Sequence, residues 1–256
     1  MFIYYFILFV FIPIQVASIG CLDENGDPVD RWVVLSTNDN YRYYWHNNTI
    51  GGGFVKSLYT TNQTTNGNIM LTMNQFYSND LDLNNIAYAL YNDDPPPPET
   101  TASSTYAHSK GVVITNNETG FWLAHSKPNW PNARAEGAAG FPDSDYAQSL
   151  MCMTLNSSVF NDLALAQMVN FPYIYDSYIS TNLETMMPAF ASWIQNTKSD
   201  DVNVTNSFSG LGGDSYIQFA KNKKWGRDLY DDFVAPTFNE SLSVETWRLG
   251  AGGRYV

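Results

Sequence analysis

The 256-residue sequence is poor in the residues that cross-link chains, bind metals or attract polyanions. It has two cysteines, three histidines and 13 lysines and arginines against 25 aspartates and glutamates, so its formal net charge is −12. This charge argues against binding of nucleic acid through the global field, but it leaves room for a local basic site. No His/Cys spacing is typical of zinc, no acidic loop is typical of calcium, and no glycine-rich phosphate loop occurs. We therefore expect no metal and no cofactor.

A long apolar run occurs once, at the N-terminus. Residues 2–16 are nearly all apolar, are interrupted by Pro13, and give way to Ala-Ser-Ile-Gly at 17–20. The run is short for a membrane span and its end suits signal peptidase, so we predict a signal peptide over 1–20, cleaved before Cys21. An uncleaved anchor is the alternative. No other stretch is apolar enough to cross a membrane, so we expect a secreted or lysosomal protein that has no membrane partner after cleavage.

The two cysteines are Cys21 and Cys152. In a secreted chain an isolated pair is most simply explained by one disulfide, here joining the mature N-terminus to mid-chain, and two free buried thiols are the alternative. Six sequons of the Asn-x-Ser/Thr type favour the same secretory route, because they are acceptors for N-glycosylation. They are Asn47, Asn62, Asn117, Asn156, Asn203 and Asn239.

Strand-like and helix-like segments alternate along the chain. Runs of β-branched, aromatic and aliphatic residues predict strands at 31–35, 41–45, 86–91, 147–155, 215–220 and 242–247. Helices are predicted near 68–76, 161–168, 183–195 and 228–234. This mixture, without short internal repeats, predicts an α/β (α+β mixed) fold with a central sheet.

One predicted β-hairpin carries the residues best suited to chemistry. The β-branched run 112–115 and the apolar run 121–125 flank a polar turn at 116–120. A turn centred in that segment places Lys110 roughly opposite His125. The hairpin therefore gathers titratable side chains at its open end.

Two of the three histidines lie there, each two residues before a lysine. His108 precedes Lys110, and His125 precedes Lys127, which the same register places roughly opposite His108. A His-x-Lys at a strand puts both side chains on one face, because strand residues alternate. The lysine then neutralises a phosphate oxygen while the histidine attacks phosphorus or transfers a proton. Taken alone the pattern is common, and a surface dipeptide without function is the alternative.

Six segments in the same order resemble the deoxyribonuclease II family over almost the whole mature length. They include His-Ser-Lys-Gly at 108–111 and Gly-Phe-Trp-Leu-Ala-His-Ser at 120–126, and the full set is 21–30, 90–93, 107–112, 120–126, 148–152 and 225–230. The resemblance implies a phospholipase D-like sandwich of two similar halves that each contribute a His-x-Lys to one site. It also implies cleavage of DNA without a metal, in acidic settings, to 3′-phosphate ends.

Carried over to this sequence, the resemblance assigns three residues to the active site. His108 matches the catalytic histidine that attacks phosphorus, and Lys110 matches the lysine that holds the phosphate. His125 matches an auxiliary residue near the site. The resemblance also implies a bridge between Cys21 and Cys152.

The sequence departs from the family pattern in its C-terminal part. The second His-x-Lys is expected beyond 242–247, where the chain ends, so we predict a complete first half over 21–160 and a partial second half over 161–256. Lys127 does not replace that half. It belongs to the same half-site as His108, whereas the acid for the leaving group approaches from the opposite side.

Two functions follow as hypotheses. The first is a metal-independent acid endodeoxyribonuclease with DNA as substrate and His108 as nucleophile, either a shortened member or the product of an incomplete gene model. The second is a secreted, catalytically inactive relative that binds DNA or another partner. Homo-oligomerisation is a further hypothesis, because a second copy would cover an open sheet edge and bring two His108 sites together.

Overall fold

The structure is a computed structural model that describes residues 18–143 and 146–244. Its centre is an eight-stranded sheet with the strand order β10-β6-β7-β8-β9-β3-β4-β5. The strands are β3 (Arg31–Ser36), β4 (Arg42–Asn47), β5 (Val55–Thr60), β6 (Ala87–Asn92), β7 (Lys110–Thr115), β8 (Thr119–His125), β9 (Gln148–Asn156) and β10 (Ile174–Ile179). The predicted central sheet is therefore present.

The sheet is antiparallel at every pairing. The fold is thus mixed α+β, and the parallel strand order usual in α/β proteins is absent from the described residues. Short connections explain the difference, since β3 to β4, β4 to β5 and β7 to β8 are joined without a crossover helix. Two smaller sheets pair β1 (Cys21–Leu22) with β2 (Pro28–Val29) and β11 (Asn203–Ser209) with β12 (Ser215–Lys221).

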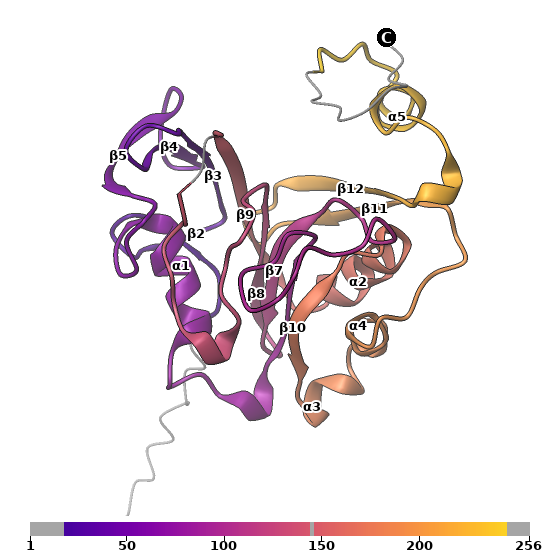
Figure 1. Cartoon of the computed structure of the whole chain (residues 1–256), viewed down its shortest axis with the longest axis horizontal. Helices are drawn as coiled ribbons and strands as arrows, with labels where there is room; N and C mark the ends of the chain where they lie inside the picture. Colours follow the sequence, from indigo (N-terminus) through magenta and orange to yellow (C-terminus); the bar gives the residue numbers. More distant parts are fainter. Residues whose placement is uncertain (1–17, 144–145, 245–256) are drawn as a thin grey trace, which may run out of the picture.

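Helices cover both faces of the central sheet (Figure 1), with α1 on one face and α2, α3 and α4 on the other. The sequence of β6 explains why both faces are covered. Tyr88 and Leu90 join the core on the α1 face, whereas Ala89 and Tyr91 join the core beneath α2 and α4. The helices are α1 (Gly67–Tyr77), α2 (Val159–Asn170), α3 (Thr181–Glu184), α4 (Pro188–Ile194) and α5 (Ala235–Phe238).

Two predicted helices differ in detail. The segment 183–195 divides into α3 and α4, because Pro188 opens a new first turn, where its missing N–H is not needed. The predicted helix at 228–234 is a π-helical turn, Tyr230–Val234, that leads into α5. Short 3₁₀ turns occur at Leu83–Asn85, Arg134–Glu136 and Lys223–Trp225.

A disulfide joins Cys21 of β1 to Cys152 of β9, as predicted, with both residues fully buried. Just before the bridge, Ile19 is 6% exposed and packs into the core, and the backbone of Gly20 hydrogen-bonds to Gln75. Residues 1–17 of the predicted signal peptide lie outside the described residues, and cleavage before Cys21 stays a prediction. No helix among the described residues is long and apolar enough to span a membrane.

The strands cross the predicted boundary between halves. β10, which follows residue 160, pairs with β6, which precedes it. The two-half division and the phospholipase D-like arrangement stay predictions, and the predicted strand at 242–247 lies largely outside the described residues.

The predicted glycosylation sites differ in accessibility. Asn47 is only 1% exposed, and its side-chain oxygen accepts hydrogen bonds from the backbone of Thr49 and Ile50. A glycan on Asn47 would therefore require a different orientation of this side chain. The other five asparagines are exposed or half-buried, namely Asn62, Asn117, Asn156, Asn203 and Asn239.

Candidate active site

The hairpin formed by β7 and β8 has the predicted register. Lys110 pairs with His125, and the ladder closes at Thr115 and Gly120. The turn is held by Asn116, whose side-chain oxygen accepts hydrogen bonds from two backbone N–H groups. Because β6 and β9 pair with its two outer edges, the hairpin lies within the sheet and its open end is a rigid support.

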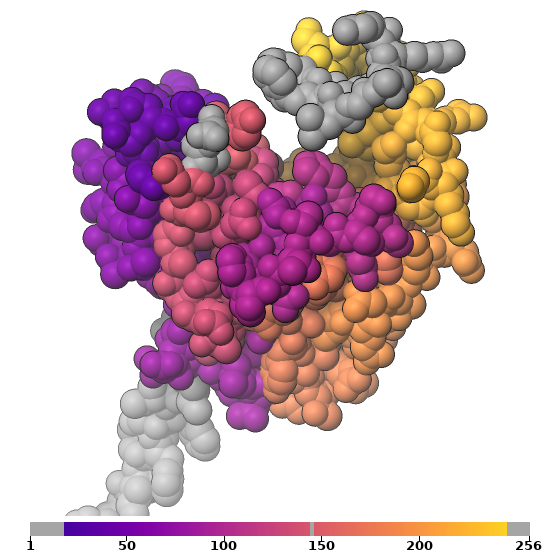
Figure 2. Space-filling model, viewed as in Figure 1, coloured from indigo at the N-terminus to yellow at the C-terminus, as the bar shows by residue number. Residues whose placement is uncertain are grey.

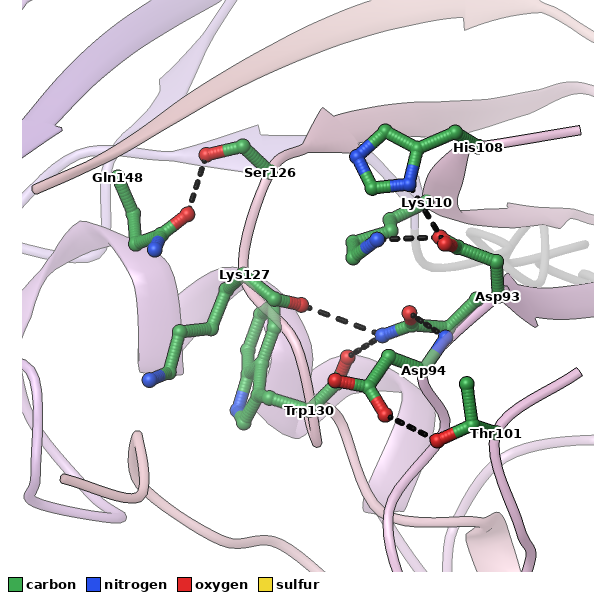
Figure 3. A network of polar contacts seen from close by, with 10 residues as sticks. Asp93, Asp94, Thr101, His108, Lys110, Ser126, Lys127, Trp130 and Gln148 are labelled. Carbon is green, nitrogen blue, oxygen red and sulfur yellow. Dashed lines mark hydrogen bonds and ion pairs between the residues drawn. The ribbon is translucent and has the colours of Figure 1, made fainter. Parts of the chain in front are cut away.

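His108 and Lys110 meet at one carboxylate, that of Asp93 (Figure 3). The Nδ1 atom of His108 lies 2.6 Å from one carboxylate oxygen, and the Lys110 ammonium forms a salt bridge with the other. Both side chains of the His-x-Lys pair thus reach the same carboxylate, although His108 precedes β7. The environments differ sharply, because the His108 side chain is 89% exposed and the Lys110 side chain is 5% exposed.

The Asp93 contact determines the tautomer of a neutral His108 ring. A carboxylate only accepts hydrogen bonds, so Nδ1 must donate and carry the proton. The lone pair of a neutral ring is then on Nε2, which points away from Asp93 in Figure 3. The ring nitrogen that carries the lone pair therefore belongs to a largely exposed side chain.

Asp93 is held in place by its neighbour Asn92, the last residue of β6. The buried Asn92 amide donates hydrogen bonds to the backbone oxygens of Lys127, at 3.2 Å, and Trp130, at 2.9 Å. Its side-chain oxygen accepts from the backbone N–H of Asp94 at 2.9 Å. One asparagine thus ties the segment after β6 to the segment after β8, and this fixes the position of the Asp93 carboxylate.

Sequence reasoning gave no role to Asp93, although it included 90–93 among the family segments. Its partners lie 15 and 17 residues further along the chain, and only the pairing of Asn92 with Lys110 brings them together. The sequence nevertheless contains a pattern from which the position of Asp93 could have been predicted. An aspartate directly after one buried strand and a His-x-Lys directly before the next meet at the same edge when the two strands form an antiparallel pair.

His125 lies beside this cluster but inside the protein. It is 9% exposed, and its ring packs edge-on against Trp130 with 5.1 Å between ring centroids. Burial, and secondarily the charge of Lys110, lowers the pKa of His125 to about 3. The ring therefore stays neutral in mildly acidic solution and is unsuited to donate a proton as an imidazolium.

The buried His125 predicts a specific loss of stability in acid. The ring is neutral in both states above the ordinary pKa of ~6.5, but below it the unfolded chain gains a proton that the folded chain does not. Lowering the pH to about 5 should therefore cost ~2 kcal/mol through His125 alone. Urea unfolding at neutral and acidic pH would measure this. His125→Gln should be less stable at neutral pH but lose ~2 kcal/mol less on acidification, and equal losses would contradict the assignment.

The prediction that Lys127 lies roughly opposite His108 is wrong. The ladder between the hairpin strands ends at Lys110 and His125, and the backbone N–H of Ala107 instead donates to Phe171. The Lys127 ammonium points away from the Asp93 carboxylate in Figure 3. It lies 5.8 Å from the ring centroid of Phe141, and burial lowers its pKa. The interpretation that Lys127 is incidental to the His108 site agrees with this placement.

The third histidine is remote from the cluster in the sheet. His46 belongs to β4, which β3, β9 and β8 separate from β7. Among the described residues there is no group of three or more His, Cys, Asp and Glu side chains arranged to hold a metal ion.

Comparison with known proteins identifies the relatives of the chain. The family model described as Deoxyribonuclease II matches residues 20–255. Plancitoxin-1 of Acanthaster planci is 27% identical over 91% of this chain and 68% of its own length. Cell death-related nuclease 6 of Caenorhabditis elegans is 29% identical over 95% of this chain and 67% of its own length. Deoxyribonuclease-2-alpha of Sus scrofa is 26% identical over 93% of this chain and 68% of its own length.

The family match spans nearly all of the chain and includes the residues gathered around Asp93. The chain belongs to the deoxyribonuclease II family. It spans about two thirds of the length of the relatives described above.

Proposed function

We propose that this protein is a metal-independent acid endodeoxyribonuclease in which His108 is the nucleophile and Lys110 binds the scissile phosphate. The observation that supports this most directly is the shared Asp93 carboxylate. It holds an exposed histidine and a buried lysine side by side in a member of a nuclease family. DNA is the proposed substrate.

In the proposed reaction, Nε2 of His108 attacks the phosphorus of a phosphodiester. An N–P bond forms as the bond to the 5′ oxygen breaks, which leaves a phosphohistidine attached to the 3′ side of the strand. Water then cleaves the N–P bond and releases a 3′-phosphate. Lys110 neutralises charge on the non-bridging oxygens, while Asp93 orients the ring and stabilises its positive form.

The leaving 5′ oxygen needs a proton, and neither other histidine of the chain suits that task. His125 is buried with a low pKa, and His46 belongs to a distant strand. We infer that the acid comes from a second His-x-Lys half-site that is not among the described residues, for example one that another copy of the chain supplies. Without it, the rate should fall by ~10²- to 10⁴-fold.

The second candidate function is binding of DNA without cleavage. The observation that favours it is the presence of one half-site among the described residues. For both candidates, the disulfide and the family match support a secretory route, either secretion or delivery to lysosomes.

A plasmid-nicking assay separates the two functions. The mature chain is incubated with supercoiled DNA at about pH 5 in the presence of a chelator. We expect nicking that His108→Ala abolishes and that His46→Ala, at a histidine on β4, leaves unchanged. Nicking that survives His108→Ala, or that requires added metal, would reject the proposed mechanism. Absence of nicking by the unsubstituted chain would favour the binding function.

A further inference from the structure

Four of the seven lysines in this acidic chain line one pocket. They are Lys198, Lys221, Lys223 and Lys224, in a pocket of about 120 Å³. None of the four forms a salt bridge with a described carboxylate. A chain with a net charge of −12 thus concentrates uncompensated positive charge in one small area.

This lysine pocket adjoins the catalytic half-site. Its opposite wall is the segment 104–107, and Ala107 directly precedes His108. Ala107 is fixed there by a hydrogen bond from its N–H to the Phe171 oxygen, at 3.0 Å, and by a parallel bridge to Pro172. In Figure 2 the magenta segment before β7 lies against the yellow surface of the C-terminal part. The pocket and His108 are therefore on one continuous surface.

Local contacts hold two of the lysines in position. The Lys198 ammonium lies 4.2 Å from the ring centroid of Phe171, which in turn stacks on Tyr106 at 5.1 Å. Lys221 donates a hydrogen bond to the backbone oxygen of Arg227 at 2.6 Å. These contacts fix the two ammonium groups without neutralising their charge, so both remain available to an anion.

The other two lysines form the open rim. Lys223 and Lys224 are exposed and lie in the 3₁₀ turn that Asn222 caps through a hydrogen bond to the backbone N–H of Lys224. Exposed ammonium groups in a row interact with phosphates as point charges and read no base sequence. The pocket thus has the chemistry of a site that follows a phosphate backbone.

We propose that the lysine pocket binds the phosphate backbone of the DNA strand adjacent to the phosphodiester at His108. The inference rests on the proposed function, since it names the surface that brings the substrate to the nucleophile. It also resolves the conflict between a polyanionic substrate and an acidic protein. The strand approaches over the basic surface, while the negative charge of the rest of the molecule disfavours other orientations.

The test measures binding separately from cleavage. Fluorescence anisotropy of a labelled DNA duplex is recorded with the His108→Ala chain over a range of salt concentrations. Lys223→Gln/Lys224→Gln is compared with Lys56→Gln/Arg42→Gln, which also removes two positive charges, from β5 and β4. We expect the first pair to weaken binding ~10-fold or more and to lower the slope of log affinity against log salt by about 1 to 2. The control pair should change affinity less than ~2-fold.

The proposal would be overturned if both double variants lost DNA affinity equally or if neither lost it. It would also be overturned if the His108→Ala chain did not bind DNA. The nicking assay keeps this failure distinct from failure of the proposed function. If the unsubstituted chain nicks DNA but the two double variants bind alike, the lysine pocket is rejected and the nuclease stands. If the chain binds through the lysines but does not nick, the pocket is supported and the catalytic proposal fails.

Discussion

Asp93→Asn is expected to lower the free energy of unfolding by about 3 kcal/mol and to reduce DNA nicking by ~10²-fold or more. The stability effect arises at Lys110, whose side chain is 5% exposed and whose salt-bridge partner is Asp93. Without the carboxylate, the buried ammonium loses its counter-charge. The activity effect arises at His108, because an amide has one acceptor oxygen and no charge and cannot accept from both the His108 ring and the Lys110 ammonium as Asp93 does.

Urea unfolding and the nicking assay measure the two effects independently. The matched control is Asp94→Asn, which removes the adjacent carboxylate, where it accepts a hydrogen bond from Thr101 at 3.0 Å. That change should cost ~1 kcal/mol or less. A further test adds Lys110→Met to Asp93→Asn. The double variant should recover much of the lost stability, because no buried charge remains without a partner. An Asp93→Asn chain as stable as the Asp94→Asn chain would contradict this account.

Removal of the disulfide should have a comparable or larger effect on stability. Cys21 and Cys152 are 131 residues apart in sequence, and closing so long a loop restricts the unfolded chain by ~4–5 kcal/mol in the chain-entropy model. The bridge also anchors β1 to β9 in the interior. The Cys21→Ala/Cys152→Ala chain should therefore unfold at a markedly lower urea concentration than the oxidised protein.

Reductant provides the control for this prediction. Reduction of the unsubstituted protein should reproduce the lower midpoint, whereas the double variant should not respond to reductant. If the double variant matches the stability of the oxidised protein, the bridge contributes little, and the core around β9 holds the N-terminus by packing alone.

The sequence predicted three interior strands of the sheet from runs rich in aliphatic and aromatic residues. The runs at 31–35, 86–91 and 147–155 correspond to β3, β6 and β9, of which β6 is buried on both faces and β3 alternates between buried and more exposed side chains. The sequence missed several partly exposed strands, among them β5, β10 and β11. β11 reads Asn-Val-Thr-Asn-Ser-Phe-Ser, a polar segment that forms a strand because it pairs residue by residue with β12. Its pattern alone resembles a loop.

In the candidate site, too, the sequence predicted the features that depend on local sequence and missed those that depend on long-range packing. The hairpin register follows from local sequence, because one turn fixes which residues of the two strands are opposite each other, and Lys110 with His125 was correct. Asp93 was not assigned, because its position depends on the long-range pairing of β6 with β7. The burial of His125 also requires the three-dimensional packing of Trp130, which lies in a segment with no regular periodicity.

The central place of β7 in the sheet has a consequence for amide hydrogen exchange. Val112, Val113 and Ile114 are fully buried and flanked by strands on both sides, so their amides should exchange only when the whole domain unfolds. The segment 103–108, a few residues earlier, is exposed or half-buried and should exchange through local opening. Lys110 thus belongs to the slowest-exchanging backbone and His108 to a fast-exchanging one. In the proposed reaction, His108 could therefore adjust to a strand of DNA while the Lys110 backbone stays fixed.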